Sequence, residues 1–230
     1  PVAFDALTVV INPTNDWAKE LTVEELKLAW EPEAQGKIMN WSQVRPGMPD
    51  QPLHLFGPGA DSGTFDYFTE SIIKKSKAIR GDFTASEDDN VLVTGVAGDK
   101  GGMGYFGLAY YLENKDKLTA VAVKNKDGKF VLPSRETVMD GSYNPLARPL
   151  FIYLNANKSA FDPKVKKFVE YYLKNAGKMS SEVGYIPLTA EEYQAITNHY
   201  VKLKTGSAFG GKAEIGLKVE EILKRVQDND

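Results

Sequence analysis

Two hydroxyl residues flank a glycine at Ser62-Gly63-Thr64, within the stretch FGPGADSGTFDYF that covers residues 56–68. The apolar spacing that follows predicts an amphipathic helix beginning at this triplet. The first N–H groups of a helix lack intrahelical partners and carry a partial positive charge, so they attract anions. A glycine lets an anion approach the backbone, and flanking hydroxyls can donate further hydrogen bonds. The same residues also form ordinary helix caps, so an anion-binding loop and a capped turn both remain open.

A nucleophilic serine is a third interpretation of Ser62. The nucleophile elbow of serine hydrolases is Gly-x-Ser-x-Gly, whereas the chain reads GADSG at residues 59–63. A catalytic triad would also need a base, and His54 and His199 fall in a strand pattern and a helix pattern, where structural roles are expected. No Gly-Lys-Ser/Thr follows the glycines, so the stretch is not a P-loop.

Arginine suits a buried oxyanion because its guanidinium is a fixed, planar donor. The arginines of this chain are Arg45, Arg80, Arg135, Arg148 and Arg225. Arg80 precedes Asp82, a carboxylate that could orient it, while Arg135 and Arg148 flank an apolar strand pattern.

The acids of SEDDN at 86–90 lack EF-hand spacing and predict a solvated turn. No metal or other cofactor is expected.

Composition narrows the function classes. The chain has 230 residues, a net charge of -3 and a pI near 5.6, which fits one large or two small domains and predicts no nucleic-acid partner. It has no cysteine, so disulfides and thiolate chemistry are excluded. No apolar run reaches the roughly 20 residues that span a bilayer. The chain opens on Pro1 without a methionine or signal peptide, which suggests processing or excision from a longer protein.

Strand and helix patterns alternate along the chain, which predicts an α/β fold. Buried strands are expected at residues 6–12 and 150–155; both end in Asn and could be two crossings of a hinge between lobes. A capping box from Thr22 to Glu25 predicts a helix that ends before Pro32.

Three further helices are expected in the last third of the chain. The helix at 163–178 should bury one face and end at Gly177 as its C-cap. Its predicted buried face comprises Val165, Phe168, Val169 and Tyr172. The other two helices are expected at 190–203 and 217–227.

Four stretches, taken in order, resemble the phosphate-binding proteins that serve ABC phosphate importers: VAFDALTVVIN, GKIMNWSQVRP, FGPGADSGTFDYFTE and ASEDDNVLVTGVAGDKGGMGYFG. The resemblance covers essentially the whole chain, which makes it more specific than any single motif. It implies a class II periplasmic-binding-protein fold, in which two α/β lobes joined by two hinge strands close on phosphate. It also implies that Ser62, Gly63 and Thr64 form the phosphate loop.

Many members of that family carry an arginine just before the loop, but positions 57–61 of this chain hold none. Arg80 is the arginine that we expect to face the ligand in its place. Asp61 adjoins the loop. It is expected either to orient Arg80 or to accept the proton of hydrogenphosphate, which sulfate lacks at neutral pH.

The resemblance also divides the chain. Residues 1–8 are expected to be a hinge strand from the first lobe, residues 9–147 the complete second lobe, and residues 148–230 the C-terminal part of the first lobe. The N-terminal part of the first lobe, with its phosphate ligands, is missing, so the first lobe is incomplete. Apolar surface at 150–155 and on the helix at 165–175 should then be exposed. A separate chain carrying the missing segment, or a rearranged dimer, would cover it; the third alternative is a fragment that folds only in part.

The leading hypothesis is a periplasmic or extracytoplasmic binding protein, for which a cell-surface lipoprotein is one form. It would capture inorganic phosphate and deliver it to an ABC permease without doing chemistry. A phosphate-binding module used in signalling or protein association is an alternative. An enzyme acting on a phosphoryl group is a third, although it would need a metal or strong base that the motifs do not indicate.

Overall fold

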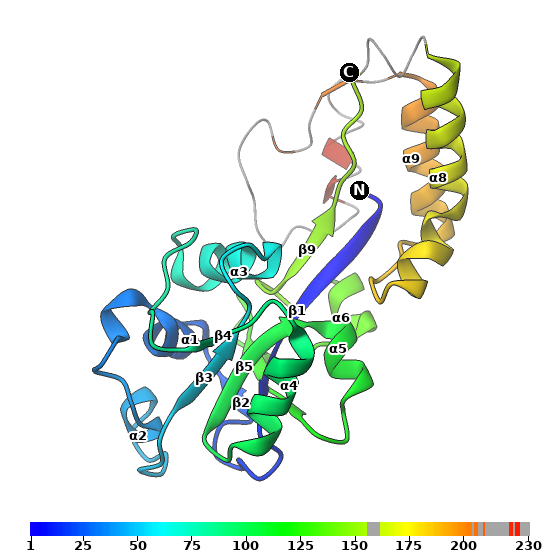
Figure 1. Ribbon diagram of the computed structural model, residues 1–230. Helices are drawn as coiled ribbons and strands as arrows, with labels where there is room; N and C mark the ends of the chain where they lie inside the picture. Colours follow the sequence, from blue (N-terminus) through cyan, green and yellow to red (C-terminus); the bar gives the residue numbers. More distant parts are fainter. Residues whose placement is uncertain (156–161, 204, 207–208, 210–220, 223, 226–230) are drawn as a thin grey trace.

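The computed structural model describes residues 1–155, 162–203, 205–206, 209, 221–222 and 224–225. The helix expected at 217–227 lies largely outside the described residues. Figure 1 shows one α/β body that carries the strands and most helices, with two long antiparallel helices beside it.

The strands are β1 (Ala3–Ile11), β2 (Glu20–Leu21), β3 (His54–Gly57), β4 (Thr84–Ala85), β5 (Gly102–Gly107), β6 (Thr119–Ala120), β7 (Ala122–Lys124), β8 (Phe130–Val131) and β9 (Ala147–Leu150). The α-helices are α1 (Val23–Trp30), α2 (Trp41–Val44), α3 (Gly63–Phe68), α4 (Asp89–Gly98), α5 (Leu108–Glu113), α6 (Arg135–Met139), α8 (Pro163–Glu182) and α9 (Ala190–Val201). A 3-10 turn covers Pro32–Ala34, and a π-helical turn at Thr69–Ile73 continues α3. None of the described helices combines the length and apolar character that a membrane span needs.

The main sheet is mixed and has the order β4-β3-β5-β1-β6, with β9 also paired to β1. Strand β3 is parallel to β4 and β5, whereas β1 is antiparallel to β5, β6 and β9. A small second sheet has the order β2-β7-β8. Strand β1 is therefore central, because its first half pairs with β9 and its second half with β5 and β6.

The apolar run of β1 is explained by burial on both faces. Leu7, Val9 and Ile11 join the main core, which includes residues of α1, α3 and the π-helical turn. Val10 faces the other way, into a second cluster with Leu92 and other residues of α4. The sequence of a strand that is covered by helices on both faces is continuously hydrophobic, without the alternation of apolar and polar residues.

The local signals in the first half of the chain predict the structure well. Thr22 and Glu25 form the expected capping box at the start of α1. The apolar face expected on the helix after Ser62 is buried at Phe65, Phe68 and Ile72. These signals are local because capping and helical periodicity depend on residues only three or four positions apart.

Two element boundaries expected in the last third of the chain are wrong. Strand β9 ends at Leu150, and the residues that follow have no regular structure, with Tyr153 77% exposed. Helix α8 runs through Gly177 to Glu182. Gly177 instead lies against Tyr193 of α9, and a Cβ there would stand 3.1 Å from the Tyr193 ring. The glycine therefore permits close packing of two helices rather than ending one.

The long helices α8 and α9 lie side by side, apart from most of the α/β body (Figure 1). Val169 and Leu173 of α8 pack on Val2, which precedes β1. Phe168, expected on this buried face, is instead 64% exposed. Strands β1 and β9 run together from the body toward these helices (Figure 1), so they are the connection between the two parts of the molecule.

Candidate functional site

The Ser62-Gly63-Thr64 loop begins α3. Ser62 is the N-cap residue in an extended conformation, and its Oγ accepts a hydrogen bond of 3.1 Å from the Thr64 N–H. Ser62 thus still has its hydroxyl proton to donate. Within the described part of the chain, the Thr64 hydroxyl has no hydrogen-bond partner. The loop therefore combines a capped helix start with two hydroxyl groups that can donate to a ligand.

Gly63 is not required by the backbone conformation or by packing. Its φ lies outside the left-handed region, and a Cβ added there would stand 3.7 Å from Nη2 and 4.0 Å from Nη1 of Arg148. Both are ordinary van der Waals distances, so alanine would fit. The residue is exposed at the first position of α3, where the absence of a side chain leaves its N–H open to an approaching group.

Arg148 is the arginine that the structure brings to this loop. It lies on β9 directly opposite Asp5 of β1. Its Nη1 donates to the Gly63 carbonyl oxygen at 2.9 Å, while Nε and Nη2 donate to the Asp5 carboxylate at 3.1 and 2.8 Å. The sequence pattern placed Arg148 only beside a strand candidate. The alignment of Asp5 with Arg148 depends on strand register, which a single sequence does not reveal.

Tyr67 holds α3 against the segment that leads into β9. Its hydroxyl lies 2.8 Å from the carbonyl oxygens of both Pro145 and Ala147, and its ring lies beneath the Arg148 guanidinium at 4.9 Å. Burial raises the pKa of the Tyr67 phenol to about 12, so it stays protonated and can donate at neutral pH. The loop is thereby attached to the strands that connect the two parts of the molecule.

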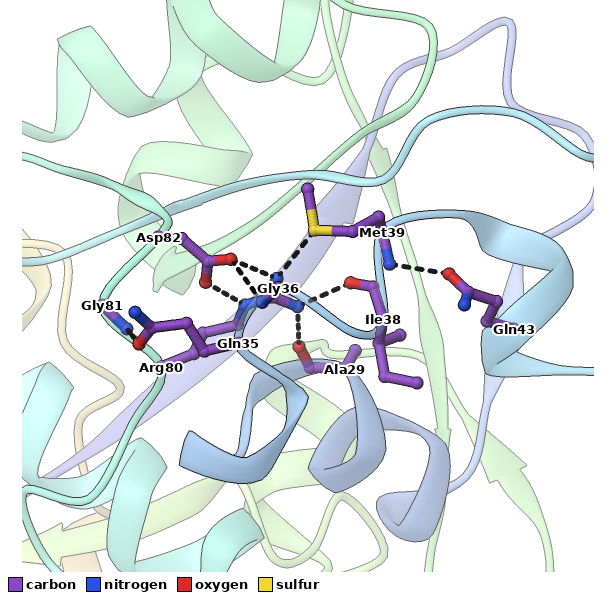
Figure 2. A network of polar contacts seen from close by, with 9 residues as sticks. All are labelled: Ala29, Gln35, Gly36, Ile38, Met39, Gln43, Arg80, Gly81 and Asp82. Carbon is purple, nitrogen blue, oxygen red and sulfur yellow. Dashed lines mark hydrogen bonds and ion pairs between the residues drawn. The ribbon is translucent and has the colours of Figure 1, made fainter.

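Arg80 has a different environment from the one expected. Its side chain is only 2% exposed. Figure 2 shows its guanidinium enclosed by the end of α1, the segment around Ile38 and Met39, and Asp82. Nε and Nη2 donate to the Asp82 carboxylate, Nη1 donates to the carbonyl oxygens of Ala29 and Ile38, and Nη2 also contacts the Met39 sulfur.

These contacts use all five N–H donors of a guanidinium, so Arg80 has none free for an anion. Contrary to the expectation from the sequence, Arg80 is a structural residue of the α/β body, and its orienting partner is Asp82 rather than Asp61. The hydrogen bond from Arg80 lowers the pKa of Asp82 to about 2, so the carboxylate is ionised and neutralises the buried guanidinium.

Asp61 is exposed beside the loop, where it can reach a ligand from solvent. His54, one of the two bases considered for a hydrolase, pairs with Asp99 at the start of β3. The Ser62 Oγ is engaged as a helix cap. Among the described residues, no hydrogen bond joins His54 to Ser62.

The sheet order, the paired connecting strands and the loop at a helix start define the class of protein. A family model described as the PBP superfamily domain matches residues 1–176, and the chain belongs to this superfamily. It is homologous to phosphate-binding proteins. It is 52% identical over 225 residues to Protein SphX of Synechocystis sp., covering 98% of this chain and 67% of that protein. It is 37% identical over 194 residues to the phosphate-binding protein PstS of Staphylococcus saprophyticus, covering 84% of this chain and 58% of that protein.

Solved structures agree on the fold. A crystal structure of a possible phosphate binding protein from Planctomyces limnophilus matches with a TM-score of 0.80 and 41% identity, covering 89% of this chain and 72% of that one. A candidate phosphate ABC transporter substrate-binding protein from Clostridium perfringens, solved with bound phosphate, matches with a TM-score of 0.61 and 25% identity, covering 82% and 70%. The chain spans about two thirds of the length of SphX and less of PstS.

Proposed function

We propose that this protein captures inorganic phosphate at the Ser62-Gly63-Thr64 loop and delivers it to an ABC importer. The observation that carries the proposal is the loop itself: two hydroxyl groups and an uncovered glycine N–H meet at the start of α3, in a chain homologous to SphX and PstS. Attachment of the loop to β1 and β9 supports it, because a ligand there would contact the strands that connect the two parts of the molecule.

Capture and release of phosphate need no covalent reaction. Phosphate offers oxygen acceptors to the Ser62 and Thr64 hydroxyls and to the helix N–H groups, and binding through hydrogen bonds is reversible. A binding protein that acts outside the cytoplasm, in the periplasm or at the cell surface, would use this site to concentrate phosphate for the permease. Isothermal titration calorimetry with inorganic phosphate tests the proposal, and absence of binding at millimolar phosphate would contradict it.

Substitution of Gly63 by Ala should separate stability from binding. The fold accommodates a Cβ at this position, and alanine is favoured over glycine in a helix by up to about 1 kcal/mol. We expect G63A to unfold at an equal or higher temperature than the wild type, while its phosphate affinity falls because the methyl group covers the N–H. Thermal denaturation and phosphate calorimetry measure the two effects.

Gly98, which ends α4 and has open space around it, provides the matched control. G98A should leave phosphate affinity unchanged. If G63A binds phosphate as tightly as the wild type, the anion does not approach the backbone at Gly63.

Selectivity against sulfate should depend on a carboxylate. Asp61 is exposed beside the loop, and a carboxylate can accept the proton of hydrogenphosphate, whereas sulfate has none to donate. We expect D61N to lose part of its preference for phosphate over sulfate, measured by competition between the two ions. Asp50, also in a loop of the α/β body, is the control position. If sulfate competes no better with D61N than with the wild type, another group makes the discrimination.

A further inference from the structure

Arg148 has hydrogen-bonding capacity that its protein contacts do not use. Nε and one N–H of Nη2 bind Asp5, and one N–H of Nη1 binds the Gly63 carbonyl oxygen. A guanidinium has five N–H donors. One N–H on each terminal nitrogen is therefore left without a partner among the described residues.

Both terminal nitrogens lie on the open side of Gly63. They stand 3.7 and 4.0 Å from the point that a Cβ on this glycine would occupy. The Arg148 side chain is 25% exposed, and that of Asp5 only 11%, so the guanidinium is reachable from solvent while its carboxylate partner is largely covered. A side chain at position 63 would therefore lie against the guanidinium.

Three contacts restrain the orientation of the guanidinium. Asp5 binds one edge of it, the Gly63 carbonyl accepts from another, and the Tyr67 ring supports its face at 4.9 Å. A guanidinium held in this way loses little conformational freedom when it binds a ligand, and its planar donors can address two oxygens of one tetrahedral oxyanion.

We propose that Arg148 is an affinity-determining residue of the anion site, that it donates its two remaining N–H groups to a tetrahedral oxyanion bound at Gly63, and that Asp5 is its positioning residue. The inference rests on the proposed function and adds to it a charged ligand from β9. Asp5 neutralises Arg148 when the site is empty and holds one edge of the guanidinium, while Nη1 donates to the Gly63 carbonyl oxygen of the loop.

Calorimetry with inorganic phosphate tests this with four variants of the protein: R148M, R148K, D5N and the control R45M. Loss of a charge-assisted contact should weaken phosphate binding roughly ten- to a hundredfold in R148M. R148K, which keeps the charge but not the planar fork, should fall between R148M and the wild type. D5N should weaken binding less than R148M, because the guanidinium is then present but poorly oriented. Arg45 forms a comparable two-point contact with Glu25 in the α/β body, and R45M should bind phosphate like the wild type.

A crystal structure with phosphate gives a second measurement that does not depend on how stable the variants are. The proposal expects an Arg148 Nη within about 3.2 Å of a phosphate oxygen. Phosphate bound at Gly63 beyond the reach of Arg148, or R148M and R148K with wild-type affinity, would overturn the role of Arg148 and leave the proposed function intact. A wild-type protein that does not bind phosphate would overturn both.

Discussion

Substitution of Arg80 by Met is expected to lower the free energy of unfolding by about 3–5 kcal/mol, because it removes the buried arginine of an ion pair and leaves carbonyl groups without donors. Arg80 is almost fully buried, and its Nη1 satisfies the carbonyl oxygens of Ala29 and Ile38 at 3.0 and 2.8 Å (Figure 2). Because Met has nearly the length of the removed side chain, the loss in free energy of unfolding comes more from the missing polar contacts than from a cavity. Urea denaturation at neutral pH measures it.

R45M is the matched control for R80M. The Arg45–Glu25 pair is also formed through two nitrogens, but the Arg45 side chain is 35% exposed, and exposed pairs contribute about 0–1 kcal/mol. A difference of less than about 1 kcal/mol between R80M and R45M would contradict the structural role given to Arg80.

Lowering the pH should reduce the difference in stability between the wild type and R80M. The pKa of Asp82 is about 2 in the folded protein, against an ordinary value of 3.8. A carboxylate with a lowered pKa stabilises the fold at pH values above its ordinary pKa, and this contribution is lost as the pH falls toward the folded-state pKa. The stability difference between wild type and R80M should therefore be constant above about pH 5 and narrow between about pH 4 and 2.

Substitution of Thr64 by Val should weaken phosphate binding roughly ten- to a hundredfold, since a hydrogen bond to a charged group contributes about 1.5–3 kcal/mol. The Thr64 hydroxyl has no protein partner within the described residues, and valine keeps the branched shape. Its removal should therefore cost binding rather than folding. Phosphate calorimetry measures the affinity, and thermal denaturation should show little change.

Two further variants test this result, one by restoring the hydroxyl and one as a control at a distant position. T64S restores a hydroxyl and should recover most of the lost affinity. Thr94 lies on α4, where its hydroxyl donates to the Asn90 carbonyl oxygen, and T94V should leave phosphate binding unchanged. Wild-type affinity in T64V would remove the Thr64 hydroxyl from the proposed site.

Arg80 and Arg148 show why the sequence pattern could not place the arginines relative to the loop. Asp82 is two positions from Arg80 and is visible as a partner, but the accepting carbonyls belong to residues 51 and 42 positions away. The partners of Arg148 are 143 and 85 positions away, on β1 and at the start of α3. Which arginine is enclosed and which reaches the loop therefore depends on long-range packing and strand register.

The sequence by itself determined the local features and the family. Capping at Thr22 and Ser62, the buried face of the helix after Ser62, and the both-sides burial of β1 follow from interactions between near neighbours or from residue type alone. The tertiary structure decided what depends on distant segments meeting. It placed Arg148 rather than Arg80 beside Gly63, continued α8 past Gly177, on which Tyr193 packs, and ended β9 at Leu150. A charged side chain or a glycine is compatible with several local environments, and only the segments that pack against it select one of them.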